Sequence, residues 1–243
     1  RSGENVVIEE FMVGKEVSIL CFCDGKTIVP MVSAQDHKRA FDNDEGPNTG
    51  GMGTISPSKY YTEDIAKMAM DTIFRPTMEA LAKEDREFVG VLFFGLMLTE
   101  QGPKVIEYNA RFGDPETQVV LPRLKTDLID IINACLNKQL NNITIEWEGY
   151  ATSCVILASG GYPDSYKKGY EIIGLEKCKE LKDVFIYHAG TDVKDNKIVN
   201  NGGRVLGVMA KGENLEKALE KSYGALNIVS FEDSFYRKDI GKR

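Results

Sequence analysis

The stretch Lys104-Val-Ile-Glu107-Tyr-Asn109-Ala-Arg111-Phe-Gly-Asp114-Pro-Glu116-Thr-Gln118 decides the fold and the site that we expect for this chain. Residues 104–109 predict a strand, and because side chains alternate between the faces of a strand, Glu107 and Asn109 point the same way. A carboxylate beside a carboxamide oxygen suits Mg²⁺, which takes few protein ligands and completes its shell with water and phosphate oxygens. The alternative interpretation is a solvated, polar strand end.

Arg111 would continue this polar face if the strand went on. A guanidinium at that position could neutralise the charge of a phosphoryl group. It could equally form a salt bridge with Asp114 or Glu116 and contact no ligand. Periodicity alone leaves both interpretations open.

Strand and helix patterns surround this stretch. Residues 89–98 form a near-continuous apolar run, typical of a strand buried on both faces. Asp24-Gly25 separates two strand-like runs and predicts a hairpin. Further strands are expected at residues 6–11, 16–23 and 27–32, and helices at 63–81, kinked or split at Pro76, and at 127–136.

Residues 35–58 show no periodicity and predict a long structured loop, of a kind that is uncommon unless functional. Residues 46–53 (Gly-Pro-Asn-Thr-Gly-Gly-Met-Gly) allow backbone N–H groups to approach an anion, and a purely structural loop is the alternative. No Gly-Lys-Ser/Thr follows, so the segment is not a P-loop. His37 could be a general base or a surface residue.

The sequence changes in character near Trp147. Strands are expected at residues 151–158, 170–173, 184–188 and 204–210, and one helix at 215–226, capped by Asn214. We therefore predict two domains, residues 1–147 and 148–243, both of the α+β class. The glycine clusters at residues 160–161 and 202–203 are interpreted mainly as turns.

Composition excludes several classes of protein. The 243 residues are 42% hydrophobic and 28% charged, which is ordinary for a globular chain. A net charge of −7 argues against general nucleic-acid binding, and no apolar run reaches the roughly 18 residues of a membrane span. The five cysteines are scattered, with Cys21 and Cys23 on one strand face rather than at zinc-ligand spacing. We expect a reduced, cytoplasmic chain that binds neither nucleic acid nor membrane.

Several motifs in a fixed order resemble one family. They are Ile8-Glu-Glu-Phe11, Gln35-Asp-His-Lys-Arg39, Gly46-Pro-Asn-Thr-Gly-Gly-Met-Gly53, Arg111-Phe-Gly-Asp-Pro-Glu-Thr-Gln118, Gly160-Gly-Tyr-Pro163, His188-Ala-Gly-Thr191, Asn201-Gly-Gly-Arg-Val205 and Tyr236-Arg-Lys-Asp-Ile-Gly241. Together they resemble phosphoribosylamine–glycine ligase (glycinamide ribonucleotide synthetase) of the ATP-grasp superfamily, over the whole chain.

The resemblance implies an architecture. Residues 1–147 would be the larger lobe of an ATP-grasp domain, an antiparallel sheet with helices, and residues 148–243 a small strand-rich C-terminal domain. The N-terminal part of such an enzyme, with its lid and most of the first ATP-grasp lobe, would precede residue 1.

The resemblance also implies residue roles. Glu9, Glu10, Phe11 and Met12 would line the adenine of ATP, and Glu16 would bind its ribose hydroxyls. Glu107 and Asn109 would hold Mg²⁺ or Mn²⁺, and Arg111 would be the catalytic residue that neutralises the transferring phosphoryl group or anchors the glycyl phosphate. Glycine and 5-phosphoribosylamine would be bound by Asp36, His37, Lys38, Asn48, Thr49, Gly50, Gly51, Gly53 and Asp114.

The implied reaction joins glycine to 5-phosphoribosylamine and yields glycinamide ribonucleotide, ADP and phosphate through glycyl phosphate, in de novo purine biosynthesis. Residues 90–99 contain no carboxylate, which departs from many ATP-grasp enzymes and implies a metal shell richer in water. We expect a monomer, and we expect the chain alone to be inactive because half of the nucleotide cleft is missing. The alternatives are another ATP-grasp carboxylate–amine ligase and a non-catalytic module derived from one.

Overall fold

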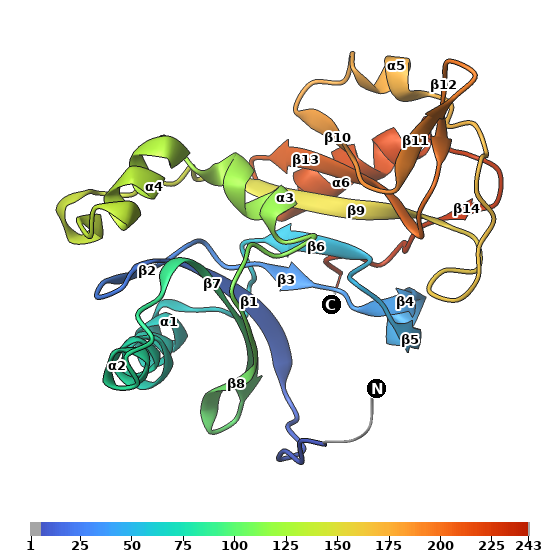
Figure 1. Cartoon of the computed structure of the whole chain (residues 1–243). Coiled ribbons are helices and arrows are strands. Elements are labelled where there is room, and N and C mark those ends of the chain that lie inside the picture. Colours follow the sequence, from blue (N-terminus) through green and yellow to red (C-terminus); the bar gives the residue numbers. More distant parts are fainter. Residues whose placement is uncertain (1–5, 243) are drawn as a thin grey trace.

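The computed structural model describes residues 6–242, in which two larger antiparallel sheets lie one above the other, with helices outside them and between them (Figure 1). The first sheet has the strand order β2-β1-β7-β8. Every strand pair in both sheets is antiparallel, which agrees with the antiparallel sheet that the resemblance implied. The four strands are β1 (Lys15–Asp24), β2 (Ile28–Pro30), β7 (Val89–Thr99) and β8 (Gly102–Asn109).

Strand β1 is buried on both faces because the two faces belong to different cores. Cys21 and Cys23 point into the core under α1 and α2, whereas Leu20 and Phe22 point toward the second sheet. This confirms the prediction that the two cysteines share one strand face. Burial raises the pKa of Cys23 to about 12, so its thiol behaves as a small apolar side chain.

The first sheet is covered by helices on both faces. Thr62 caps α1 (Glu63–Ala69) by accepting a hydrogen bond from the Ile65 N–H. The expected interruption near Pro76 is a π-helical turn, η2 (Met70–Phe74), followed by α2 (Arg75–Lys83) with the proline in its first turn. On the other side of the sheet, α4 (Leu128–Leu136) begins after the capping residue Asp127.

The second sheet has the order β10-β13-β9-β6-β3, with β14 beside β9, and α6 packs on it. Two of its strands come from the predicted loop of residues 35–58, so this sheet contains residues from both sides of position 148. Its elements are β3 (Gln35–Asp36), β6 (Gly53–Ser56), β9 (Ala151–Ser159), β10 (Val184–His188), β13 (Arg204–Gly212), β14 (Ser234–Phe235) and α6 (Leu215–Leu226).

Two predicted strands are wrong. Residues 6–11 are exposed and form no strand, because their backbone pairs with no strand within residues 6–242. Residues 170–173 make only the isolated bridges Glu171↔Val199 and Ile173↔Ser230.

Short elements that the sequence did not indicate lie outside the two larger sheets, and four strands among them form two separate two-stranded sheets. They are β4 (Arg39–Phe41), η1 (Asp42–Asp44), β5 (Glu45–Asn48), α3 (Thr117–Val120), η3 (Leu121–Arg123), η4 (Leu140–Asn142), α5 (Leu175–Cys178), β11 (Thr191–Lys194) and β12 (Lys197–Asn200). No helix in the described range has the length and apolarity of a bilayer-spanning segment.

Candidate active site

A polar cleft of about 470 Å³ opens where the start of β1, the residues around β3 and the end of β8 meet. Its walls carry mainly charged and amide side chains, which suit a charged ligand better than an apolar one. Several residues predicted for substrate and for ribose binding line it. The lining residues are Gly14, Lys15, Glu16, Gln35, Asp36, His37, Lys38, Arg39, Asp44, Asn48 and Ile106.

Lys38 joins two carboxylates across this cleft. Its Nζ lies 3.3 Å from Glu16 Oε2 on β1 and 3.7 Å from Glu107 Oε1 on β8. Burial alone would lower the pKa of Lys38, but the carboxylates of Glu16 and Glu107 outweigh burial and raise it. The ammonium group therefore stays charged, and it brings together residues that were predicted separately for ribose, metal and substrate.

Glu107 and Asn109 lie at the end of β8. Between Gly95 and Leu96 the register of β7 against β8 shifts, and such bulges often lie beside functional sites because they re-aim side chains. Opposite Glu107 the chain needs a glycine, because a Cβ on Gly95 would stand 2.9 Å from Glu107 Cγ. The bulge and the glycine together allow the carboxylate to reach Lys38.

The donor set of Glu107 and Asn109 fits a small, hard cation. Both side chains offer oxygen atoms, and the side chain of Glu107 is 47% exposed. No cluster of three or more His, Cys, Asp or Glu side chains suited to a metal occurs within residues 6–242. A cation bound by Glu107 and Asn109 would therefore take most of its ligands from water and phosphate oxygens.

Arg111 lies beside this pair. Its guanidinium donates to the Phe112 carbonyl at 2.8 Å and to Asn109 Oδ1 at 3.4 Å. Asp114 and Glu116, the two acids that could have paired with Arg111, have other partners in the described structure. Arg111 thus keeps an exposed guanidinium next to the candidate metal ligands.

Arg204, which was expected to begin a strand after a glycine turn, links the glycine-rich loop to the 111–118 stretch. From the start of β13, its guanidinium donates to the Gly50 carbonyl at 2.8 Å and to Asp114 Oδ2 at 3.1 Å. Tyr162, from the neighbouring glycine cluster, accepts a hydrogen bond from the Gly50 N–H at 3.1 Å. Both residues belong to the region after position 148, so that region helps to shape the site.

The glycine-rich loop has a structural backbone rather than an open anion cradle. The N–H of Thr49 donates to the Lys38 carbonyl, that of Gly51 to Thr49 Oγ1 and that of Met52 to the His37 carbonyl. Since the Gly50 N–H is also bonded, four successive N–H groups have protein partners. Gly53 begins β6 and pairs with Val155. Of the substrate-binding residues predicted in the glycine-rich segment 46–53, Asn48 is the one that lines the cleft.

Asp36 is a largely buried carboxylate next to this loop. It accepts from the His37 N–H at 2.8 Å, and a Cβ on Gly51 (φ +109°) would stand 2.6 Å from its Oδ1. Burial, and secondly the carboxylate of Glu116, raise the pKa of Asp36 well above its ordinary value. Glu116 is itself 5% exposed, accepts from Ser18 Oγ at 3.0 Å and has a pKa raised by burial.

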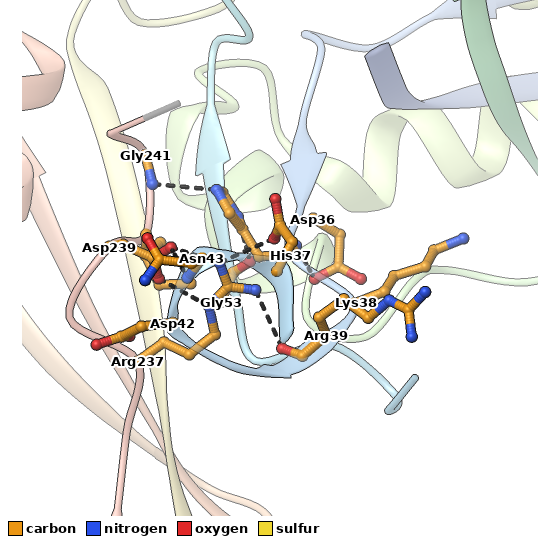
Figure 2. Close-up of polar contacts among 12 residues, drawn as sticks. Asp36, His37, Lys38, Arg39, Asp42, Asn43, Gly53, Arg237, Asp239 and Gly241 are labelled. Atoms are coloured by element: carbon orange, nitrogen blue, oxygen red, sulfur yellow. Dashed lines mark hydrogen bonds and ion pairs between the residues drawn. The ribbon is translucent and has the colours of Figure 1, made fainter. Parts of the chain in front are cut away.

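His37 is neither an exposed residue nor placed as a base toward the cleft. The residue is 6% exposed, its Nδ1 lies 3.0 Å from the Gly53 carbonyl, and its Nε2 accepts from the Gly241 N–H at 3.1 Å. Figure 2 shows the ring directed toward Gly241. Both ring nitrogens are occupied by backbone groups, so in this geometry neither reaches a substrate.

The segment predicted to line adenine lies at the edge of the first sheet. Glu10 pairs with Lys104 Nζ at 2.8 Å. Phe11 is 91% exposed, and with Met12 it borders a shallow hollow of about 330 Å³ beside the β7–β8 turn. Glu9 is also exposed. The structure thus presents this segment but does not bring it into the cleft around Lys38.

The chain matches two family models. The phosphoribosylglycinamide synthetase ATP-grasp (A) domain matches residues 1–117, and the C domain of the same synthetase matches residues 152–243. A phosphoribosylamine–glycine ligase of Caldanaerobacter subterraneus is 51% identical over 98% of this chain, and this chain covers 57% of that protein. The trifunctional purine biosynthetic protein adenosine-3 of Gallus gallus is 51% identical over the whole chain, which covers 24% of it.

Solved structures agree with these matches. The phosphoribosylamine–glycine ligase of Thermotoga maritima superposes with a TM-score of 0.85 at 35% identity, over 95% of this chain and 56% of that one. The fold is therefore that of an ATP-grasp protein followed by a small strand-rich domain. The chain belongs to the phosphoribosylglycinamide synthetase family, and it spans little more than half the length of its bacterial relatives.

Sequence reasoning missed Arg204, Tyr162 and Glu116 as parts of this site. A signal for Arg204 was present, because it is a lone cation between a double glycine and the apolar run Val-Leu-Gly-Val-Met-Ala of a buried strand. Glu116 lies inside the quoted 111–118 stretch, but its burial against Ser18 depends on a contact across 98 residues. Such pairings cannot be read from local patterns.

Proposed function

We propose that the protein carrying this chain ligates glycine to 5-phosphoribosylamine with ATP, giving glycinamide ribonucleotide, ADP and phosphate. The observation that carries the proposal is that Lys38, in the polar cleft of a chain of this family, lies between Glu16, which also lines the cleft, and Glu107. The residues that the resemblance implied for ribose, metal and substrate thus face one another.

The proposed chemistry has two steps. The glycine carboxylate attacks the γ-phosphorus of ATP and the bond to ADP breaks, which gives glycyl phosphate. The amine of phosphoribosylamine then attacks the acyl carbon, phosphate leaves, and the nitrogen loses a proton. Both steps depend mainly on positioning the reactants and neutralising charge.

Residues in the cleft and at the neighbouring end of β8 could supply both positioning and charge neutralisation. Arg111 and Lys38 supply positive charge for phosphoryl oxygens, and Mg²⁺ or Mn²⁺ held by Glu107 and Asn109 would add the charge neutralisation that a divalent cation provides. Asp36, whose pKa burial raises, is suited to accept the proton that the amine loses.

Further parts of the proposal concern binding. We assign ATP to Glu9, Glu10, Phe11, Met12 and Glu16, with the first four completed by the N-terminal part of the enzyme. We assign glycine and phosphoribosylamine to the residues predicted for them in the cleft and in the 46–53 loop. Among these, His37 and the backbone of residues 49–53 shape the site, and Asp114 acts through its contact with Arg204.

The remaining proposals concern organisation. We propose a domain division at residues 147/148, with the second sheet completed by β3 and β6 from the first domain. We also propose a monomeric, cytoplasmic enzyme that works without nucleic acid or membrane. Because the nucleotide cleft needs the N-terminal part of the enzyme, residues 1–243 alone should not catalyse the reaction.

The test is an assay of the full-length protein with each substrate omitted in turn. Release of ADP and phosphate only when ATP, glycine and phosphoribosylamine are all present supports the proposal. Turnover of a different carboxylate or amine, with none for glycine and phosphoribosylamine, would contradict it and favour another ligase of the superfamily. Robust turnover by residues 1–243 alone would contradict the need for the N-terminal part.

A further inference from the structure

Residues 237–241 lie against residues 37–44, on the opposite side from the side chain of Lys38 (Figure 2). Polar contacts join the two segments across about 200 positions of sequence. They are Gly241 N to His37 Nε2 at 3.1 Å, Arg237 Nη1 to the Arg39 carbonyl at 3.0 Å, Arg237 Nη2 to Asp44 Oδ1 at 2.9 Å, Lys238 N to Asp42 Oδ1 at 2.7 Å, and Asn43 N to Asp239 Oδ2 at 2.9 Å.

Arg237 is the centre of these contacts. It is 1% exposed. Its Nε and Nη2 donate to the two carboxylate oxygens of Asp239, each at 2.8 Å. Two further contacts reach the Arg39 carbonyl from Nη1 and Asp44 from Nη2. A buried guanidinium is costly unless its donors are satisfied, so this arrangement holds only while residues 39–44 stay where they are.

Helix α6 supports the 237–241 segment from behind. Tyr223 Oη donates to the Arg237 carbonyl at 2.9 Å and accepts from the Ile240 N–H at 3.1 Å. Ile240 is fully buried in the core between α6 and the second sheet. The segment is therefore anchored to a rigid element, and it can hold the loop that it contacts.

Lys38 lies between the two residues whose positions this segment fixes. His37 is bonded to Gly241, and the carbonyl of Arg39 is bonded to Arg237. The side chain of Lys38 is 33% exposed, and ion pairs at that exposure are individually weak. The direction of Lys38 toward Glu16 and Glu107 must therefore come largely from its backbone.

We infer that Arg237 is a positioning residue that, through the backbone on either side of Lys38, holds this lysine in the cleft. The inference rests on the proposed function for its kinetic consequence, but its structural part stands by itself. Arg237 touches no atom that reacts, and it acts through Arg39 and Asp44.

The structural test is hydrogen exchange on the 243-residue chain, measured by mass spectrometry over residues 37–49. Arg237→Lys keeps the charge but cannot serve Asp239, Asp44 and the Arg39 carbonyl together. We expect exchange in this segment to become about tenfold faster, since hydrogen bonds to a charged group are lost, with no change in β1 or β7. Tyr223→Phe, which removes only the support from α6, should give a smaller increase in the same segment.

The matched control is Lys221→Met. Lys221 also forms an ion pair from α6, with Asp183 at 2.8 Å, but contacts nothing in residues 37–49. It should leave exchange in that segment unchanged. Unchanged exchange at 37–49 in Arg237→Lys, or an increase spread evenly over the chain, would overturn the inference.

The kinetic test uses the full-length enzyme. In Arg237→Lys, kcat should fall about tenfold, because Lys38 is proposed to supply charge to the phosphoryl oxygens, and KM for ATP should rise, because Lys38 pairs with Glu16 and Glu107. A smaller amount of folded enzyme whose kcat and KM for ATP both stay within about twofold would overturn the inference. If the unchanged enzyme shows no ligase activity, the proposed function fails, and the exchange experiment still decides whether Arg237 positions the loop.

Discussion

His37 Nε2 accepts a hydrogen bond from the N–H of Gly241 at 3.1 Å, although the two residues are 204 positions apart in sequence. The other ring nitrogen, Nδ1, lies 3.0 Å from the Gly53 carbonyl and must donate to it. The two contacts select one neutral tautomer of the ring. A histidine inside the motif that borders the cleft is thus used to join the substrate loop to the C-terminal segment.

The first prediction concerns pH. Burial lowers the pKa of His37 from its ordinary 6.5, so folding favours the neutral ring. The neutral His37 ring therefore contributes to the free energy of unfolding above about pH 6.5. This contribution is lost as the pH falls through the lowered pKa that His37 has in the folded state. Urea unfolding of the chain between pH 7.5 and about 5 should show this loss, and His37→Gln should show a flatter pH dependence.

His188→Gln is the matched control for this experiment, since the chain has only two histidines. His188 is exposed and its Nδ1 lies near Thr191 Oγ1. The pH dependence of stability should be the same in this variant as in the unchanged chain. If His37→Gln and His188→Gln behave alike, the assigned role of His37 is wrong.

The second prediction concerns Gly51. Alanine at this position combines a positive φ of +109° with a Cβ that would stand 2.5 Å from Pro115 Cδ. Gly169 also has a positive φ, of +89°, but nothing lies within 4 Å of its Cβ position. Gly169→Ala should cost about 1 kcal/mol of stability from the backbone alone, and Gly51→Ala clearly more. Denaturant unfolding of both variants measures the difference, and equal costs would refute the close approach.

The third prediction concerns Arg204 and Asp114. Arg204→Met removes donors from the Gly50 carbonyl and from Asp114, and should cost about 1–2 kcal/mol. Because the Asp114 side chain is 56% exposed, the coupling between the two residues in a double-mutant cycle with Asp114→Asn should be no more than about 1 kcal/mol. A coupling several times larger would mean that the salt bridge, rather than the contact to the loop, carries the role of Arg204.

The fourth prediction concerns the cation. In the full-length enzyme, Glu107→Gln should raise the Mg²⁺ concentration needed for half-maximal activity by on the order of tenfold, because a charged oxygen ligand is lost. Asn109→Asp keeps an oxygen donor and should change it less. Glu100→Gln, in the exposed β7–β8 turn, is the control and should leave the requirement unchanged. An unaltered Mg²⁺ requirement in Glu107→Gln would remove Glu107 from the metal site.

The fifth prediction tests the core that supports β8. Phe94 is fully buried, and its ring centroid lies 4.6 Å from that of Phe74. Phe94→Ala should cost about 3–5 kcal/mol through the cavity that it leaves. Thermal unfolding measures this, and a cost under about 1 kcal/mol would show that the helices around η2 do not pack on the sheet as described.

Local chemistry explains which elements could be predicted. Asp24-Gly25 specifies its hairpin, Thr62 the start of α1, and the alternation through Cys21 and Cys23 the face of β1. Helix α4 begins after Asp127, one residue later than its expected start. Residues 6–11 have the same apolar character as a strand, but strand formation requires a neighbour for the backbone. The predicted loop at residues 35–58 contains β3 and β6 because β9, about one hundred residues later, pairs with β6.

The candidate site likewise has features that local sequence predicted and features that only the tertiary structure decided. By itself the sequence determined the family, the α+β class, and the pairing of Glu107 with Asn109 on one face of β8, because motifs and strand alternation are local properties. Only the tertiary structure decided that Lys38 meets Glu16 and Glu107, that His37 faces Gly241, and that Arg204 and Arg237 hold the loop. Those contacts depend on which strands pair and which segments are buried together, and these are decided by the packing of the whole chain.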